Sequence, residues 1–196
     1  FAAKYAAVGS VLGRLAKIHV GRNIGRVLDG PTVIEAAGLS NGAALATFTD
    51  VNLGALHDKG YIFLRKCATK SGMYFNSDPV AAPTSDDYNS ISRGRAIDKV
   101  VRITNGVYTD FVNDDPELDA TSGKLNVAVV KDLQGSLETE VQLQMLGATK
   151  EISGIKATVD EAQNVLQTKK VKVKVKVVPK GSIEAIDVDL SYSLTI

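Results

Sequence analysis

The sequence predicts an α+β fold, in which an antiparallel or mixed sheet carries helices on one face and ends in a long β-hairpin. Two long segments, Asp87 to Val112 and Leu125 to Leu146, place apolar residues at three- and four-residue spacing, which is typical of helices. Two later segments, Lys170 to Val178 and Ile183 to Ile196, alternate apolar and polar residues, which is typical of half-buried strands. Helices followed by strands indicate layered packing.

The N-terminal part predicts helices joined by turns. Ala2 to Lys17 has apolar residues at helical spacing among alanines and glycines, which favours a helix packed closely on a neighbour. Asp29-Gly30-Pro31 is a strong turn signal. A short helix is expected from Asp50 to His57, with Asp50 as its N-cap.

An apolar segment, Tyr61 to Cys67, and a shorter one, Met73 to Asn76, predict a β-hairpin around Ser71-Gly72. The loop from Ser77 to Asp87 is rich in proline, serine and aspartate, and it marks a domain boundary, with domains at 1–84 and 85–196. The chain starts without methionine and enters a helical pattern at once, so we expect the first domain to be truncated at its N-terminus.

The second domain is predicted to order its elements as helix, helix and three strands. Asp86 or Asp87 is the expected cap of the first helix, and Gly147 is the expected stop of the second. A strand is predicted from Ile152 to Val159, followed by a polar connection with one helical turn before the last two strands.

In the last two predicted strands, the apolar face and the charged face both fit the same pairing register. If Val178 pairs with Ile183 across the loop, apolar residues face apolar residues and Lys174 meets Asp187. The residues from Tyr192 onward then have no partner within the hairpin. An unpaired apolar strand at a terminus indicates pairing with another sheet, in the same domain or in a neighbouring copy.

Composition excludes several functional classes. The formal net charge is +1, from 23 Lys+Arg and 22 Asp+Glu, so no overall field favours nucleic acid or a membrane surface as partner. The single cysteine, Cys67, excludes an intrachain disulfide and cysteine-cluster metal sites, and His19 and His57 have no cysteine at zinc-ligand spacing. No apolar run is long enough to span a bilayer. We expect no cofactor and no metal.

Gly38-Leu39-Ser40-Asn41-Gly42 matches the nucleophile elbow of serine hydrolases, in which a strained turn exposes the serine. That chemistry needs a histidine well downstream of a carboxylate, whereas the later histidine here, His57, follows closely on a short predicted helix. A plain turn is therefore favoured over a serine hydrolase at Ser40, and we expect no enzyme.

The run from Lys170 to Lys176 places lysines on one strand face and gives a second alternative, a monomeric module that binds polyanions. The competing interpretation is a solvated face neutralised by Asp187 and Asp189 on the opposite strand. The register above favours the second interpretation, and lysines along a strand also discourage unwanted edge pairing.

In order and spacing, essentially the whole chain resembles the C-terminal part of contractile phage tail sheath proteins, of the kind carried by phage-like elements in Bacteroides. The segments that carry the resemblance are Val8 to Arg14, Asn23 to Val27, Gly60 to Arg65, Ser92 to Lys99 and Phe111 to Pro116.

The resemblance implies a structural subunit of a phage tail or phage-like injection device, in the virion tail and assembled in the bacterial cytoplasm. Its partners would be other copies of itself and a tail tube protein. Residues 1–84 would end a truncated sheath domain, and residues 85–196 would be the sheath C-terminal domain. A C-terminal strand arm would join neighbouring subunits, and Arg93 and Arg95 are candidates for contacts with the tube or other subunits. The candidate interface residues are Ile186, Val188, Leu190, Tyr192, Leu194 and Ile196.

Overall fold

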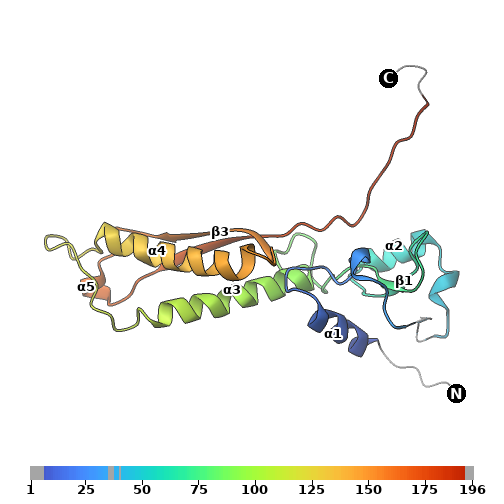
Figure 1. The fold of residues 1–196 in the computed structure, drawn as a ribbon, viewed down its shortest axis with the longest axis horizontal. Helices are drawn as coiled ribbons and strands as arrows, with labels where there is room; N and C mark the ends of the chain where they lie inside the picture. Colours follow the sequence, from blue (N-terminus) through green and yellow to red (C-terminus); the bar gives the residue numbers. More distant parts are fainter. Residues whose placement is uncertain (1–6, 35–37, 40, 193–196) are drawn as a thin grey trace.

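The computed structural model describes residues 7–34, 38–39 and 41–192. Figure 1 shows an N-terminal half, which contains α1, α2 and a small hairpin, and a longer C-terminal half, in which α3 and α4 lie along a two-stranded sheet. Beyond the sheet, the chain leaves the body as an extended segment that runs away from both halves.

The N-terminal half is built from short elements. Helix α1 spans Val8–Lys17, 3-10 turns span Val27–Asp29 and Leu45–Thr47, and helix α2 spans Asp50–Asp58. The predicted helices and the turn at Gly30, which has a φ of 82°, are confirmed, although residues 2–6 of the first helix lie outside the described residues. The N-cap of α2 is Thr49 and not Asp50, because Thr49 has the extended backbone that a cap needs and its hydroxyl accepts a bond from the Asn52 N–H at 3.4 Å.

The predicted hairpin in this half is confirmed but short. Strand β1, Leu64–Arg65, pairs antiparallel with β2, Tyr74–Phe75. Loops satisfy the flanking backbone groups in place of a longer ladder: the Asn76 side chain accepts from the Phe63 N–H at 2.9 Å. The hairpin therefore serves to bury apolar residues in the core of this half, which comprises Ile18, Ile24, Leu45, Leu64, Met73 and Phe75.

The C-terminal half contains helix α3, Ile91–Thr109, and helix α4, Val127–Val141, which continues as a π-helical turn over Gln142–Leu146. The sheet consists of β3, Ile152–Val159, and β4, Val173–Pro179, with the short helix α5, Val165–Thr168, between them. Strand β3, the helical turn after it and the helix ending at Gly147 match the sequence-based prediction.

Helix α3 is capped by Ser90, not by Asp86 or Asp87. The Ser90 hydroxyl accepts from the Arg93 N–H at 3.4 Å, and the buried carboxylate of Asp78 accepts from the Ser92 N–H at 2.8 Å. Asp86 instead accepts from the Tyr88 N–H at 2.7 Å and closes a turn within the preceding loop. The two groups at the helix start satisfy N–H groups that have no partner inside the helix.

Both helices pack on one face of the two-stranded sheet, which confirms the α+β class. Alternate residues of β4 point toward this core, whereas its lysines point outward. The packing is tight: Leu137, Val141 and Met145 have no exposed surface. The core consists of Ala96, Val100, Ile103, Leu137, Val141, Met145, Ile152 and Ala157.

The prediction that β4 forms a hairpin with Ile183 to Leu190 is wrong. Strand β4 pairs antiparallel with β3, so that Val175 lies opposite Ala157 and Lys176 opposite Lys156. Residues 180–192 form no strand. The Pro179 to Ser182 turn does not close because the chain beyond β4 is bonded to the N-terminal half and continues past the end of the sheet.

Candidate subunit interface

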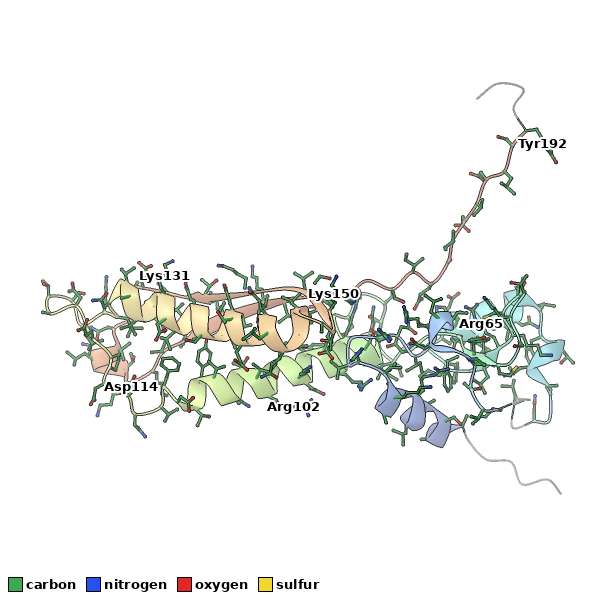
Figure 2. The ribbon with its side chains drawn as sticks, in the orientation of Figure 1. Arg65, Arg102, Asp114, Lys131, Lys150 and Tyr192 are labelled. Carbon is green, nitrogen blue, oxygen red and sulfur yellow. The ribbon has the colours of Figure 1, made fainter. Side chains whose placement is uncertain are left out.

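The most unusual surface of the molecule is the segment of residues 180–192, which we call the arm. The exposed fraction of its large apolar side chains runs from 67% at Val188 to 109% at Tyr192. Figure 2 shows Tyr192 near the far end of the arm, away from both halves. Soluble monomers rarely expose a continuous series of such side chains, so the arm is a candidate binding segment.

The first part of the arm, residues 180–184, is fixed to the N-terminal half, and we call it the root. The Asn23 amide donates to Ser182 at 3.2 Å and to Ser77 at 2.9 Å. The Ser77 hydroxyl donates to Glu184, whose carboxylate also lies 3.2 Å from His57 Nε2. Described residues after Glu184 make no hydrogen bond or ion pair with the body, so the arm is held at its base and free beyond it.

The root also interacts electrostatically with Asp78, which bonds to the first residues of α3. Burial raises the pKa of Asp78, the bond from Ser92 opposes this shift, and the negative charge of Glu184 adds to it. Asp78 accepts from the Ser92 N–H and its own carbonyl accepts from the Ile91 N–H at 2.8 Å. The same short region therefore fixes both the start of α3 and the direction in which the arm leaves.

Sequence reasoning did not identify the root. Asn23 and Ser77 are far from Glu184 in the chain, and nothing in their residue types pairs them. One signal was present, however: the apolar positions change phase between Ile183 and Ile186. A strand with one buried face cannot place both of these residues on it, so the freely alternating part of the arm begins at Ile186.

Of the predicted interface residues, Ile186, Val188, Leu190 and Tyr192 all lie on the arm and are exposed. Leu194 and Ile196 lie outside the described residues. The alternation of the described four gives an extended chain one apolar side, and Asp187 and Asp189 lie on the other side. Such a segment can supply main-chain hydrogen bonds and apolar side chains to another sheet edge.

The structure places Arg93 and Arg95 at the start of α3, where both are partly buried. Arg93 donates to the Asn89 side chain at 3.0 Å, which lies one turn earlier. Arg95 donates to the Leu15 carbonyl at 2.8 Å and so fixes the end of α1 against α3. These bonds lie within the chain, and a contact of either arginine with a partner stays a prediction.

The lysine face of β4 is not neutralised by Asp187 and Asp189 of the same chain, which corrects the predicted charge pairing. Lys174 lies opposite Thr158, and Lys176 lies opposite Lys156. A hollow of about 1020 Å³ follows this face and is lined by lysines, by Thr158 of β3 and by polar residues of the connection before β4; the lining residues are Thr158, Asp160, Gln163, Asn164, Thr168, Lys170, Lys172 and Lys174.

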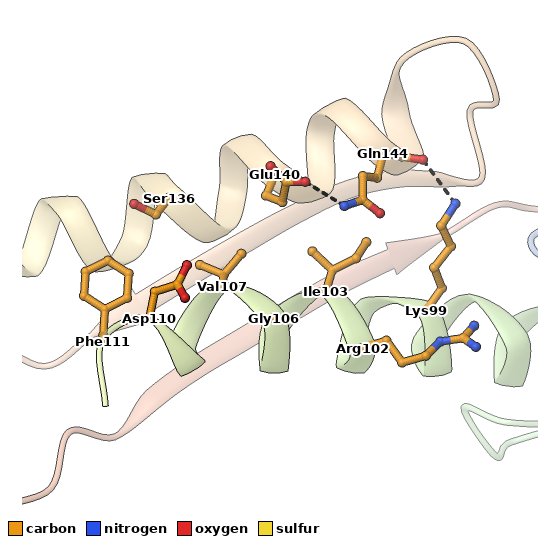
Figure 3. Close-up of a pocket in the computed structure, with 10 residues that line it drawn as sticks. All are labelled: Lys99, Arg102, Ile103, Gly106, Val107, Asp110, Phe111, Ser136, Glu140 and Gln144. Atoms are coloured by element: carbon orange, nitrogen blue, oxygen red, sulfur yellow. Dashed lines mark hydrogen bonds between the residues drawn. The ribbon is translucent and has the colours of Figure 1, made fainter. Parts of the chain in front are cut away.

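A second hollow, of about 770 Å³, lies between α3 and α4. Figure 3 shows two hydrogen bonds at this hollow: the Gln144 side-chain amide donates to Glu140 at 2.6 Å, and Lys99 donates to the backbone carbonyl of Gln144 at 3.2 Å. Lys99 also forms an ion pair of 2.6 Å with the buried Glu151. The bond from Lys99 of α3 to the Gln144 carbonyl links the two helices at the edge of their core, whereas the bond between Gln144 and Glu140 lies within one helix.

Other proposed chemistries find little geometry to support them. Ser40 lies outside the described residues; its neighbours Gly38 and Ala44 form a single antiparallel bridge. Both ring nitrogens of His57 have partners elsewhere, with Asn76 at 3.2 Å from Nδ1 and Glu184 at 3.2 Å from Nε2. Among the described residues, no group of three or more His, Cys, Asp or Glu side chains could hold a metal ion. None of the described helices is long and apolar enough to span a bilayer.

Several solved structures share this fold. The chain resembles a chain of the anti-feeding prophage (AFP) baseplate, with 16% identity and a TM-score of 0.56 over 81% of this chain and 44% of that one. It resembles the AFP helical sheath in the contracted state equally well, with 16% identity and a TM-score of 0.56 over 80% of this chain and 44% of that one.

A third structure is the contracted sheath complex of PVC, an extracellular contractile injection system. Here the identity is 13% and the TM-score 0.55, over 81% of this chain and 45% of that one. This chain thus spans less than half the length of each of the three chains, and at these identities the likeness concerns the fold.

Family comparisons match nearly the whole sequence, although no curated protein matches it. Residues 1–78 match the N-terminal domain of DUF2586, and residues 87–196 match the C-terminal domain of the same family. Because the C-terminal match alone covers more than half of the chain, this protein belongs to the DUF2586 family.

Proposed function

We propose that this chain is a structural subunit of a contractile tail sheath, in a phage tail or a phage-like injection device. The observation that carries the proposal is the arm: an alternating, exposed segment that leaves a folded body and pairs with no strand of the described chain. The fold shared with AFP and PVC sheath chains supports the same assignment.

In this proposal, residues 186–196 of one subunit add as a strand to a sheet of a neighbouring subunit. Main-chain hydrogen bonds supply the affinity, and the alternating apolar side chains supply the specificity. Ile186, Val188, Leu190 and Tyr192 are the described residues in this role, and Leu194 and Ile196 would continue it.

Because the root is bonded to the body, the arm could also act as a joint between subunits. Contraction would rotate subunits as rigid bodies, and the segment after Glu184 would act as the joint that keeps them connected. Such a mechanism needs no bound cofactor and no catalytic residue. A tail tube protein is a further proposed partner, and Arg93 and Arg95 remain candidates for contacts with it or with other subunits.

The proposal also covers the setting of the protein. The subunit would assemble in the bacterial cytoplasm and function in the tail, with residues 1–84 belonging to a first sheath domain and residues 85–196 forming the C-terminal domain. The source implied by the sequence resemblance is a phage-like element of Bacteroides. Tube and baseplate genes beside its gene would support this source, and their absence would count against it.

The test compares the full chain with a variant that lacks residues 186–196, by electron microscopy and sedimentation. We expect the full chain to form rings or polymers and the shortened chain to be a monomer with an unchanged circular dichroism spectrum. The root and both halves are retained, so a loss of folding is not expected. Monomers in both cases, or identical polymers, would contradict the proposal.

One observation favours an alternative function. Lys174 and Lys176 form no ion pair with any described residue, which leaves the β4 face positive. A monomeric module that binds polyanions would use this face, and its binding of heparin would weaken steeply with salt. Absence of heparin binding at low salt would remove this alternative.

A further inference from the structure

A hollow of about 530 Å³ lies where the two halves meet, and we call it the junction hollow. Its walls come from the turns after α1, from the connection between α4 and β3, and from the root. Figure 2 labels two of its lining residues, Lys150 from the C-terminal half and Arg65 from the N-terminal half. The hollow therefore combines side chains from distant parts of the chain.

The junction hollow carries more positive than negative charge. Both carboxylates that line it already have partners: Lys99 lies 2.6 Å from Glu151, and His57 lies 3.2 Å from Glu184. Against these two carboxylates, the lining includes five lysine and arginine side chains, namely Arg22, Arg26, Arg65, Lys150 and Lys180.

Much of this positive charge is not neutralised within the chain. Arg22 and Arg26 share the single carboxylate of Asp29, at 3.3 and 2.6 Å, so one positive charge remains in excess there. The other three cations are exposed and form no ion pair with any described residue, and we call them the unpaired cations: Arg65, Lys150 and Lys180. The hollow thus favours a negatively charged partner.

Apolar side chains lie among these charges. Leu28 and Ile183 both line the junction hollow, and each is 83% exposed. Interfaces between proteins combine a buried apolar centre with complementary charges around it. A partner that fits this hollow therefore brings carboxylates together with an exposed apolar side chain.

The loop after α3 has this composition. Residues 110–119, which we call the acidic loop, contain no lysine or arginine. Val112 in this loop is 66% exposed. The loop contains five carboxylates, all exposed and none in an ion pair with a described residue: Asp110, Asp114, Asp115, Glu117 and Asp119. Its unneutralised negative charge is the counterpart of the charge in the junction hollow.

The acidic loop cannot reach the junction hollow of its own chain. Ser92, in the first turn of α3, lines the hollow, whereas the loop begins where α3 ends. The 19 residues of this helix keep the two about 28 Å apart. Figure 2 shows Asp114 at the far end of the C-terminal half, away from Lys150 and Arg65. A contact between loop and hollow therefore needs two copies.

We infer that the acidic loop of one copy docks in the junction hollow of a second copy, with Val112 beside Leu28 and with Asp114 and Asp115 facing the unpaired cations. The inference rests on the proposed function because it requires copies that assemble, but it uses no residue after Glu184. Because the contact joins two different surfaces, it repeats from copy to copy and builds a ring or a filament.

Cross-linking between two full-length chains, both with Cys67→Ser, tests the contact. The donor carries Val112→Cys, the acceptor carries Leu28→Cys, and a short bismaleimide is added to the assembled mixture. We expect a donor–acceptor heterodimer, identified by mass spectrometry. An acceptor with Val51→Cys is the matched control, because Val51 is 80% exposed but lies outside the hollow, and it should give no heterodimer above the level of unassembled chains.

Charge reversal tests the role of the charges. Asp114→Lys with Asp115→Lys in the donor, or Lys150→Glu with Lys180→Glu in the acceptor, should each lower the yield of heterodimer about tenfold. Mixing the two reversed chains should restore the yield, which a folding defect could not do. Lys131→Glu, an exposed reversal on α4, is the control and should have no effect.

The outcomes separate this inference from the proposed function. If assembly requires residues 186–196 but the cysteines at 112 and 28 do not cross-link, the proposed function stands and this inference fails. It also fails if charge reversal has no effect or is not rescued. If assembly persists without residues 186–196 and the heterodimer forms, this contact builds the assembly and the proposed role of the arm fails. A full chain that stays monomeric overturns both.

Discussion

Strand β4 and the arm follow one another in the chain and have the same alternating pattern, yet their surroundings differ completely. In β4, the valines at 173, 175 and 177 are half-buried against the helices and the strand is paired with β3. In the arm, Ile186, Val188 and Leu190 are at least 67% exposed and unpaired. The difference shows that alternation specifies an extended conformation with an apolar side, but not the partner that covers this side.

Changes in the two segments should also affect different quantities, namely the free energy of unfolding for β4 and association for the arm. The pairing of β4 is part of the fold of the C-terminal half, so changes in its core should affect the free energy of unfolding. The apolar side chains of the arm contribute nothing to that core, so changes there should affect association alone.

The largest effect on stability is expected in the core beneath β3 and β4. Leu137→Ala should lower the free energy of unfolding by about 2–5 kcal/mol, because Leu137 is fully buried and the substitution leaves a cavity. Leu190→Ala on the arm is the matched change and should stay within about 0.5 kcal/mol of the parent chain. Urea denaturation of both variants measures this, and equal losses would mean that the arm packs on the body.

The next effect concerns association. Val188→Pro removes an N–H from the centre of the proposed added strand and should abolish assembly, whereas Val188→Ala keeps that N–H and should weaken assembly partially. Sedimentation of the two variants checks this. Neither change should alter the unfolding midpoint, because Val188 is exposed in the unassembled chain; normal assembly of the proline variant would exclude strand addition at this position.

A smaller effect is expected at the root. Ser77→Ala removes a hydroxyl that accepts from Asn23 and donates to Glu184, which should cost about 1 kcal/mol of stability. It should also speed amide exchange in residues 180–184. Ser191→Ala, in the free part of the arm, is the control, and identical exchange in both variants would show that the root bonds do not hold the arm.

The smallest effect is a pH dependence at Asp78. Burial raises the pKa of its carboxyl above the ordinary value of 3.8, so the folded chain binds the proton more tightly than the unfolded chain. This contribution to stability is therefore complete below the ordinary pKa and is lost as the pH rises through the raised one. Asp78→Asn retains an acceptor for Ser92 and removes the charge.

Relative to the parent chain, the Asp78→Asn variant should thus gain stability between acidic and neutral pH. Urea denaturation at both pH values gives the difference. A gain at acidic pH instead would show that the hydrogen bond from Ser92 outweighs burial and lowers the pKa of this carboxyl.

The sequence predicted the helices and β3 well because each has a local signal. The apolar spacing from Leu125 to Leu146 and the stop at Gly147 define one helix without reference to the rest of the chain. Cap positions were predicted less well: Ser90 and Asp78 act at the start of α3, and Asp78 reaches it through a loop that residue types do not describe.

Local sequence signals did not predict which strands pair. The lysines of β4 and the aspartates of the arm fit one register well, which led to a hairpin that the chain does not form. Whether β4 and the arm pair within one chain depends on the root bonds of Asn23 and Ser77. These bonds join segments that are far apart in the sequence. The sequence predicted an unpaired segment only from Tyr192 onward, whereas in the structure Ile186, Val188 and Leu190 are unpaired and exposed as well.

The central claim is that the arm is unpaired in one chain and becomes a strand when chains assemble. Amide hydrogen exchange on unassembled and assembled chains tests it most directly, because a backbone N–H is protected when it bonds within a sheet. We expect the amides of Lys174 and Lys176, which face β3, to be protected in both states, and alternate amides of residues 186–192 to be protected only after assembly. Fast exchange of residues 186–192 in the assembled state would contradict the claim.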